Sequence, residues 1–298
     1  MFVFLFVCVS FMSPTFLTGS NLINVLMQNA IIGLLAIGQT MVILTGGIDL
    51  SVGATLALTT MVSAMSAAWG LLPSLILGLA TGMIIGMLNG FLVAKVKMVP
   101  FIVTLATMGI GRGIAALMTN GTHQMTDAYR FVSDWYVGPI PCVVVTWLVV
   151  TLLFQWLLKR NTTIRHMLAV GGDEETAHLA GVATQRTKFL AYTLSGALSS
   201  LGAFFYLSRL GHGYYAIGSS YNMDSIAAVI IGGTSVFGGK GSFVGTMFGL
   251  LILGVLENII NLTNMSVYMK DAFKGVIILA IILFNVTRRN RQLRSKKL

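Results

Sequence analysis

The stretch LPSLILGLATGMIIGMLNGFLVA, residues 72–94, decides the fold class of this chain. It contains no charged residue and is long enough for a membrane crossing, which takes about 20 apolar residues in a helix. Four of its glycines recur every four residues, and a similar pair occurs further along the chain. Helices in lipid associate by close backbone approach, so this glycine strip predicts a helix–helix contact rather than a substrate site. The strip consists of Gly78, Gly82, Gly86 and Gly90, and the similar pair is Gly245 and Gly249.

Comparable apolar segments recur along the whole chain. Of its 298 residues, 56% are hydrophobic and 9% are charged, whereas a soluble domain carries about 25% charged residues. The sequence therefore predicts an all-α, polytopic membrane protein with about ten transmembrane helices. The eighth segment is short and interrupted by glycine, which predicts a broken or partial crossing. The predicted spans are 2–17, 22–45, 51–69, 72–94, 100–119, 140–158, 189–210, 223–237, 243–264 and 271–287.

No linker or change in composition divides the chain, so residues 1–298 are expected to form a single integral membrane permease domain. The first apolar segment resembles a secretory signal peptide only superficially. It has no positively charged n-region, and a second apolar segment follows almost at once. We therefore interpret it as the first membrane span.

The net charge of +10 follows the predicted topology. With ten spans and the N-terminus inside, most basic residues lie on the cytosolic side, as the positive-inside rule expects. They lie in a loop at 159–188, in smaller loops and in a basic cytosolic tail at 288–298. This placement predicts attraction to membrane lipid and not to nucleic acid. The loops hold Lys95, Lys97, Lys159, Arg160, Arg165, Arg186, Lys188 and Lys240, and the tail holds Arg288, Arg289, Arg291, Arg294, Lys296 and Lys297.

Motifs for catalysis or cofactor binding are missing from the sequence. The segment closest to an ATP-binding phosphate loop, GGKGS at 238–242, lacks the upstream glycine and the Ser or Thr directly after the lysine. The sequence also has no HExxH, no Cys/His cluster with metal-ligand spacing and no GxSxG. We predict no catalytic residue, no metal and no cofactor on this chain, so the protein is not expected to be an enzyme.

Amide side chains in the second span form one candidate translocation path. Asn21, Asn24, Gln28 and Gln39 project within about 60° of one another on a helix of 3.6 residues per turn. Amides both donate and accept hydrogen bonds, so such a stripe could line a route for a neutral, hydroxyl-rich solute. It could equally hold one helix to the next by hydrogen bonds. The sequence leaves both interpretations open.

Other buried polar candidates in or near the spans are Asp49, Asn89, Arg112, Glu257 and Asn258, and all of them except Arg112 are candidates for the same path. A charge at mid-membrane costs about 2.5–3.5 kcal/mol on insertion scales, so these groups are expected to be paired or hydrated. The glycines before Asp49 predict a turn, and Asp49 is then expected to cap the next helix. Contact with a substrate is the alternative role.

The cytosolic segment GGDEETAHLAG, residues 171–181, is a candidate docking element. Asp173 is placed to cap a short helix, with Glu174 and Glu175 in the first turn, where the helix dipole favours negative charge. Ala177, Ala180 and Gly181 are predicted to form a smooth face that fits a groove on another protein. A solvated loop helix is the alternative.

Two glycine-rich stretches resemble each other: VILTGGIDLSVG at 42–53 and VIIGGTSVFGG at 229–239. Together with the pair IIGMLNG at 84–90 and ILGVLEN at 252–258, they suggest two related halves that meet across a central pathway, as in many transporters. Chance similarity between glycine-rich apolar segments is the alternative.

Three stretches resemble a known family: TGGIDLSVG at 45–53, AVGGDEETAHLAGV at 169–182 and IAAVIIGGTSVFGGKGSFVGTMFG at 226–249. They are similar to the membrane permeases of bacterial ABC importers for simple sugars, of the ribose permease type. The resemblance runs from about residue 14 to the tenth span. GGIDLSVG and IGGTSVFGGKGS are specific to this family, whereas the cytosolic loop would also be shared with amino-acid permeases of related fold.

The resemblance implies a type II ABC importer-like fold in the bacterial cell (inner) membrane. It implies a second permease copy or a homologous permease, a cytosolic ABC ATPase that binds ATP, and a periplasmic sugar-binding protein. The family's coupling helix, on which the ATPase docks, corresponds to residues within 171–181. The residues implied are Gly171, Asp173, Glu174, Glu175, Ala177 and Gly181.

Two other transport functions remain as alternatives. A secondary transporter driven by an ion gradient would need an acidic group in the membrane, for which Glu257 is the candidate. An amino-acid importer permease of the same design is the other.

Overall fold

A computed structural model describes residues 14–118, 120 and 122–262. It also describes the single residues Phe6, Ser10, Met269, Ala272, Gly275, Val276, Leu279, Leu283 and Thr287. Most of the predicted span 2–17 lies outside the described residues, as does all of the span 271–287 except isolated positions. The basic tail at 288–298 lies wholly outside them.

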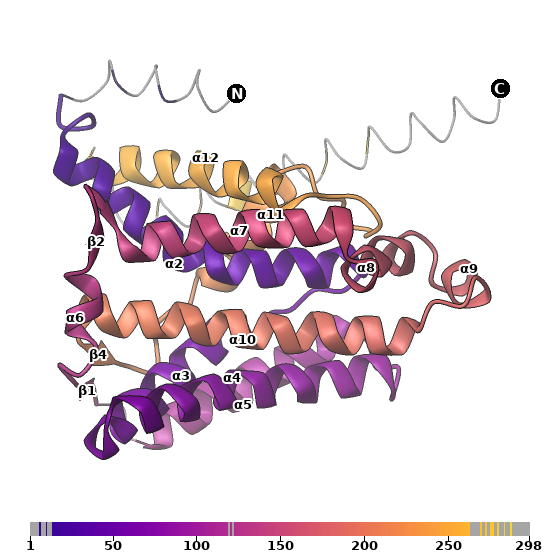
Figure 1. Cartoon of the computed structure of the whole chain (residues 1–298), viewed down its shortest axis with the longest axis horizontal. Helices are drawn as coiled ribbons and strands as arrows, with labels where there is room; N and C mark the ends of the chain where they lie inside the picture. Colours follow the sequence, from indigo (N-terminus) through magenta and orange to yellow (C-terminus); the bar gives the residue numbers. More distant parts are fainter. Residues whose placement is uncertain are drawn as a thin grey trace.

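Long apolar helices run side by side through the described part of the chain (Figure 1). Seven are long and apolar enough to cross a membrane, which confirms a multi-pass membrane protein but not the predicted count of ten. A short 3₁₀ helix, η1 (Ala67–Trp69), extends the second of them. The seven are α2 (Gly19–Leu44), α3 (Val52–Ser66), α4 (Leu71–Ala94), α5 (Pro100–Met118), α7 (Cys142–Arg160), α10 (Thr184–Leu210) and α12 (Phe243–Leu262).

The eighth predicted span is shorter than the sequence indicated. Helix α11 covers Tyr221–Ile231, whereas the prediction extended to residue 237. Gly232 and Gly233 follow the last helical residue, and Gly233 has φ 88°, a conformation that L side chains rarely adopt. At 1.5 Å per residue, α11 is about 16 Å long and therefore too short for a full crossing, as the predicted partial crossing requires.

Short elements mark the two ends of the helix bundle (Figure 1). At one end, β1 (Gln124–Met125) pairs antiparallel with β4 (His212–Gly213), and β2 (Tyr136–Val137) pairs antiparallel with β3 (Ile140–Pro141). Helix α6 (Arg130–Ser133) lies at this end too. At the opposite end, α8 (Thr162–Gly172) and α9 (Glu174–Leu179) extend beyond the bundle. This second end carries the predicted cytosolic loop 159–188.

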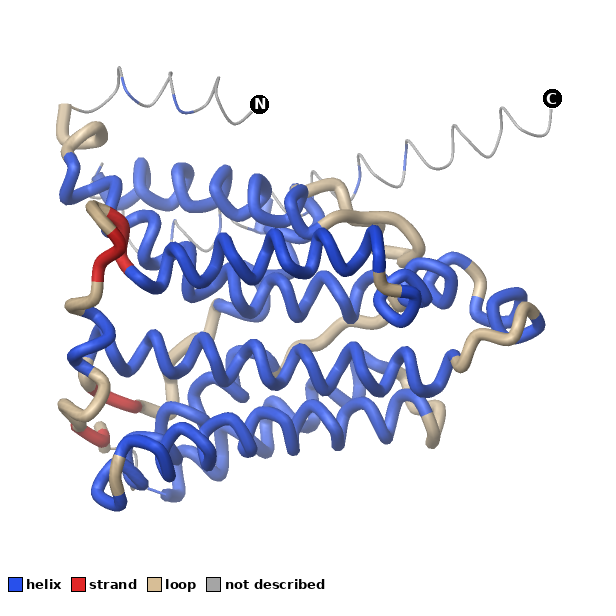
Figure 2. Tube along the Cα trace, in the orientation of Figure 1, coloured by secondary structure: helices blue, strands red, loops and turns tan. Residues whose placement is uncertain are grey.

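Helix α2 lies at the centre of the fold, and all of its residues from Asn29 to Leu44 are buried. Helices α4, α5 and α7 lie at the perimeter and expose large apolar side chains along their length, as lipid-facing helices do. Figure 2 shows this all-helical bundle, with the strands confined to one end. Examples of the exposed perimeter residues are Ile76, Ile84, Ile102, Ile110, Val149, Leu152 and Trp156.

The glycine strip of α4 makes the contact that the sequence predicts, and its main partner is α10. A Cβ atom at Gly82 would clash with the carbonyl oxygen of Gly196, and a Cβ atom at Gly196 would clash with that of Gly82. Gly90 meets the backbone of Phe189 in the same way. Gly245 approaches the backbone of α11 near Gly232. These positions allow helix backbones to touch where any side chain would separate them.

Candidate functional site

Helix α9 forms the protruding tip of the end that carries the loop 159–188. Its N-cap is Asp173, whose Oδ1 accepts a hydrogen bond from the Thr176 N–H at 2.7 Å. That backbone hydrogen bond lowers the pKa of the Asp173 carboxyl, so the group is ionised at neutral pH. Glu174 accepts a hydrogen bond from the Lys188 ammonium at 2.5 Å, which ties the start of α9 to α10. The predicted capped helix is therefore confirmed.

The predicted face of small residues, Ala177, Ala180 and Gly181, does not form one accessible surface in the structure. Ala177 is only 6% exposed, so it packs toward the permease itself, whereas Ala180 and Gly181 are exposed. The largest accessible apolar side chain here is Leu179, which is 81% exposed. Leu179 is not among the residues predicted from the sequence, although a lone leucine in this polar segment was the available signal. A partner protein would meet Leu179, Ala180 and Gly181 before it met Ala177.

A groove of about 690 Å³ lies beside α9. Glu174, Glu175 and Gly181 of the predicted docking set line it, together with residues from the end of α4 and the start of α10. Gly171, another member of that set, lies away from this groove at the end of α8, against the end of α2. The residues lining the groove are Ala94, Lys97, Glu174, Glu175, His178, Gly181, Val182, Ala183, Thr184, Gln185 and Arg186.

A polar cavity of about 240 Å³ lies between α2 and α12, toward the end of the bundle opposite α9. It brings together five of the predicted path residues from two helices far apart in sequence. Asn21 and Asn258 form a reciprocal amide pair, with Nδ2 to Oδ1 distances of 3.0 and 2.8 Å. The lining residues are Asn21, Asn24, Val25, Gln28, Asn29, Gly254, Glu257, Asn258, Asn261 and Leu262.

Two polar residues of the cavity, Asn29 and Asn261, were not predicted from the sequence. Asn29 donates from Nδ2 to the Val25 carbonyl oxygen at 2.9 Å, and its side chain contacts Gly254 of α12. Asn261 lies one turn beyond Glu257 on α12. Asn29 projects about 80° from Asn21, outside the stripe of about 60°, so helical spacing did not place it in the predicted set.

The remaining predicted path residues form a separate buried cluster around Asp49. Gln39 is fully buried and lies about 16 Å along α2 from Gln28, so it does not reach the cavity. With the Gln39 amide assigned the orientation in which both of its polar atoms find partners, its nitrogen donates to the Asp49 carbonyl oxygen at 2.9 Å. Its amide oxygen accepts from the Asp49 N–H at 3.2 Å. Gln39 therefore holds the turn between α2 and α3.

The Asp49 carboxylate accepts three hydrogen bonds. Oδ1 accepts from the N–H and the hydroxyl of Ser51 at 2.9 and 2.6 Å, and Oδ2 accepts from the hydroxyl of Ser195 at 3.0 Å. Asn89 donates from Nδ2 to the Ser51 hydroxyl at 2.9 Å. Asp49 therefore stabilises the turn that precedes α3 and joins it to α4 and α10, while Ser51 occupies the N-cap position. The prediction that Asp49 caps α3 is therefore wrong: its carboxylate binds the N-cap residue Ser51 and no N–H group of the first turn of the helix.

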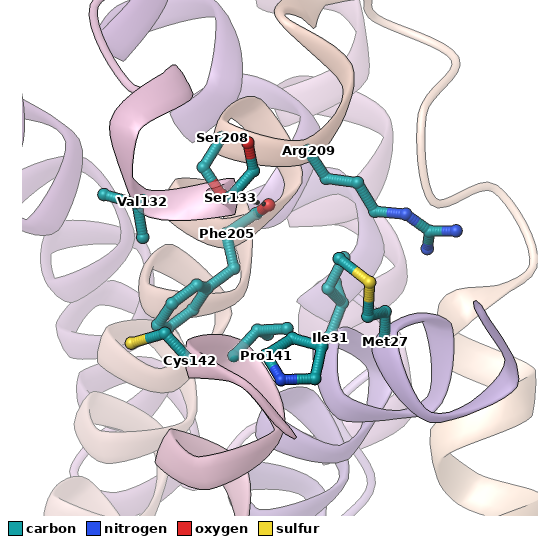
Figure 3. A pocket seen from close by; sticks show the side chains of 10 residues that line it. Met27, Ile31, Val132, Ser133, Pro141, Cys142, Phe205, Ser208 and Arg209 are labelled. Atoms are coloured by element: carbon teal, nitrogen blue, oxygen red, sulfur yellow. Dashed lines mark hydrogen bonds between the residues drawn. The ribbon is translucent and has the colours of Figure 1, made fainter. Parts of the chain in front are cut away.

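Other polar groups near the end that carries the strands form hydrogen bonds within the protein. Arg112 of α5 donates to the carbonyl oxygens of Tyr215 and Ile217 at 2.7 and 3.2 Å. Figure 3 shows a small cavity between α2, α6, α7 and α10, with the Arg209 side chain extending away from Cys142. Its volume of about 10 Å³ is that of a single water molecule, so it cannot hold a sugar. The described residues contain no group of three acidic, His or Cys side chains placed to hold a metal ion.

Comparison with known proteins identifies the chain's relatives. Residues 21–282 match the family model described as branched-chain amino acid transport system / permease component. The ribose import permease protein RbsC of Bacillus subtilis (strain 168) is 43% identical over 288 residues, 94% of this chain and 89% of that protein. The RbsC of Escherichia coli (strain K12) is 38% identical, covering 92% of this chain and 88% of the relative.

A third relative carries a different substrate in its name. The L-arabinose transport system permease protein AraH of Escherichia coli (strain K12) is 34% identical over 95% of this chain and 88% of its own length. No solved structure matches the chain. The relatives confirm the resemblance to membrane permeases of bacterial ABC importers for simple sugars. Such permeases are non-catalytic, multi-pass subunits of the cell (inner) membrane, as predicted for this chain. The chain therefore belongs to the permease family described as branched-chain amino acid transport system / permease component.

Proposed function

We propose that this chain is the permease subunit of an ATP-driven importer for a monosaccharide, and that it forms the translocation path and docks a separate ATPase. The observation that carries the proposal is the amide-lined cavity between α2 and α12, because it places polar side chains in a membrane domain whose perimeter is apolar. The similarity of the chain to ribose and arabinose permeases, over more than nine-tenths of its length, supports a sugar as the solute.

The chemistry of the cavity suits a neutral polyol. Asn24, Gln28, Asn258 and Asn261 each offer an amide oxygen that accepts and an amide nitrogen that donates hydrogen bonds. Asn21 offers its oxygen only, because its Nδ2 already donates to the Phe16 carbonyl oxygen and to Asn258 Oδ1. Sugar hydroxyls also donate and accept, so a sugar can replace its water hydrogen bonds one by one along such a wall. Glu257 adds one carboxylate acceptor. In our proposal this cavity is the outer part of the path, which a second permease copy or a homologous permease completes.

Energy for transport comes from partner chains in this proposal. A cytosolic ABC ATPase, which binds the ATP, contacts α9 and the groove beside it, and a periplasmic sugar-binding protein delivers the solute at the end that carries the strands. ATP binding closes the ATPase and moves the α9 helices of the two permeases. A motion of this kind shifts the permease only if the ATPase contacts its two states differently.

The solute class is tested by competition. The complete importer, reconstituted in proteoliposomes with its ATPase and binding protein, is expected to take up radiolabelled ribose or another pentose when ATP is supplied. An excess of unlabelled monosaccharides should suppress this uptake, whereas leucine and valine should not. Uptake of labelled leucine that sugars fail to suppress would show that the importer carries amino acids instead.

Replacing Gln28 with leucine tests the path. The change removes one donor and one acceptor from the cavity wall, and a lost hydrogen bond to a solute costs about 0.5–1.5 kcal/mol, or roughly 2- to 12-fold in rate. We expect sugar uptake to fall by about that factor while expression and basal ATP hydrolysis stay the same. Thr81→Val, on the perimeter helix α4, is the matched control and should leave uptake unchanged. Normal uptake by Gln28→Leu would place the path elsewhere.

A further inference from the structure

Backbone atoms of three segments come into contact at the end of the bundle that carries α9. The segments are the end of α8, the end of α2 and the loop 232–242 that leads into α12. The Gly239 N–H donates to the carbonyl oxygen of Leu44 at 3.1 Å. A Cβ atom at Gly171 would clash with that same carbonyl oxygen and would lie 2.7 Å from the Gly239 nitrogen. Real Cβ contacts are never this close, so Gly171 must be glycine for the contact to form.

The loop 232–242 is locked into this contact by its own glycines. A Cβ atom at Gly238 would lie 2.8 Å from the carbonyl oxygen of Gly171 and 2.9 Å from the nitrogen of Gly46. Gly238 and Gly239 have φ values of 83° and 73°, which L side chains rarely adopt. The two glycine-rich stretches that resemble each other in sequence, 42–53 and 229–239, therefore touch directly. We call the contact between Gly171, Leu44, Gly238 and Gly239 the glycine joint.

The joint connects the proposed docking helix to both helices that line the polar cavity. On one side, only Gly172 and Asp173 separate Gly171 from the start of α9 at Glu174, so a movement of α9 acts on Gly171 through a short connection. On the other side, Leu44 is the last residue of α2, and the loop containing Gly239 ends where α12 begins. Helices α2 and α12 carry the amide pair Asn21–Asn258 at their opposite ends.

The turn after Leu44 extends the connection into the middle of the bundle. It carries Asp49, which is hydrogen-bonded to Ser195, eleven residues and about 16 Å from the start of α10. Backbone atoms in direct contact cannot move aside as a flexible side chain can. Packed elements of this kind therefore transmit displacements from one to the next. A shift of α8 at the joint therefore displaces α2, α12 and the Asp49 turn together.

We propose that the glycine joint transmits the ATPase-driven movement of α9 to the two helices that form the sugar path. The proposal rests on the proposed function and adds to it the positioning residue, Gly171, through which docking and path are coupled.

Adjacent glycines provide the variant and its control. Gly171→Ala should separate the three segments, whereas Gly172→Ala should be silent, because nothing lies within 4 Å of a Cβ atom at Gly172. In the reconstituted importer we expect Gly171→Ala to retain basal ATP hydrolysis within about twofold. Its sugar uptake per ATP hydrolysed should fall at least about tenfold. Unchanged uptake, or uptake and hydrolysis that fall in equal proportion, would overturn the proposal.

Hydrogen–deuterium exchange on the unmodified importer tests the joint without depending on whether a variant folds. Addition of a non-hydrolysable ATP analogue is expected to change exchange at 171–181, 45–51 and 235–241 together. A change confined to 171–181 would overturn the joint and leave the docking proposal standing. No change even at 171–181 would overturn both, so the two failures are distinguishable.

Discussion

Leu179→Asp is expected to lower the affinity of the permease for its ATPase by about 10- to 100-fold. Leu179 is the exposed apolar side chain at the tip of α9, and burying a leucine stabilises a contact by about 1.5–3 kcal/mol. Each 1.4 kcal/mol corresponds to a factor of ten in affinity. Titration of the purified permease with ATPase measures the effect. ATP-driven uptake should fall in parallel.

The control for this variant keeps an apolar side chain of similar volume at position 179. Leu179→Met should bind the ATPase within about threefold of the original chain, because volume-conserving apolar exchanges cost less than about 1.5 kcal/mol. Gly181 is a poorer test of docking, since its φ of 85° makes any substitution strained whether or not a partner binds there. If Leu179→Asp binds as tightly as Leu179→Met, the tip of α9 is not the docking surface.

Gly82→Leu is expected to prevent α4 and α10 from packing. A Cβ atom at Gly82 already meets the Ser200 hydroxyl and the Gly196 carbonyl oxygen, and the rest of a leucine side chain has no space. Inserting atoms into a packed contact costs about 1–3 kcal/mol and occasionally more, and here the obstacle is the backbone. We expect folded permease after detergent extraction to fall several-fold and its melting temperature to drop. Both are measured by size-exclusion chromatography after stepwise heating.

Gly109→Leu serves as the comparison for Gly82→Leu. Gly109 is in the perimeter helix α5, where a Cβ atom has no neighbour within 4 Å. A leucine at this position should leave folded yield and melting temperature unchanged. Equal losses in the two variants would mean that the α4–α10 glycine contact does not limit stability.

The sequence predicts the long helices well because one physical constraint, the thickness of the membrane, sets their length and composition. Helices α4, α5 and α12 begin within one residue of the predicted spans. The predicted span 223–237 was wrong at its C-terminal end, because it extends beyond the last residue of the helix. Hydropathy continues through Val236 and Phe237, but the backbone conformation at Gly233 ends the helix before them. Apolar composition alone does not predict this backbone conformation.

The grouping of the polar side chains was predicted in part, because helical spacing relates residues only within one helix. Helical periodicity placed Asn21, Asn24 and Gln28 on one face of α2, and the structure finds them in one cavity. The partner of that face, the Asn258 side of α12, depends on which helix packs beside α2 and cannot be found from spacing within one helix. The same limit applies to Ala177, because its burial depends on how α9 folds back against the bundle.

The central claim is that this chain is a passive conduit driven by a separate ATPase, and reconstitution measures it directly. The permease alone, in vesicles with an imposed proton or sodium gradient, should accumulate no labelled sugar against its gradient. Adding the ATPase, the binding protein and ATP should produce uphill uptake that persists in the presence of an ionophore. Uphill accumulation by the permease alone, abolished by the ionophore, would contradict the account and identify an ion-driven transporter.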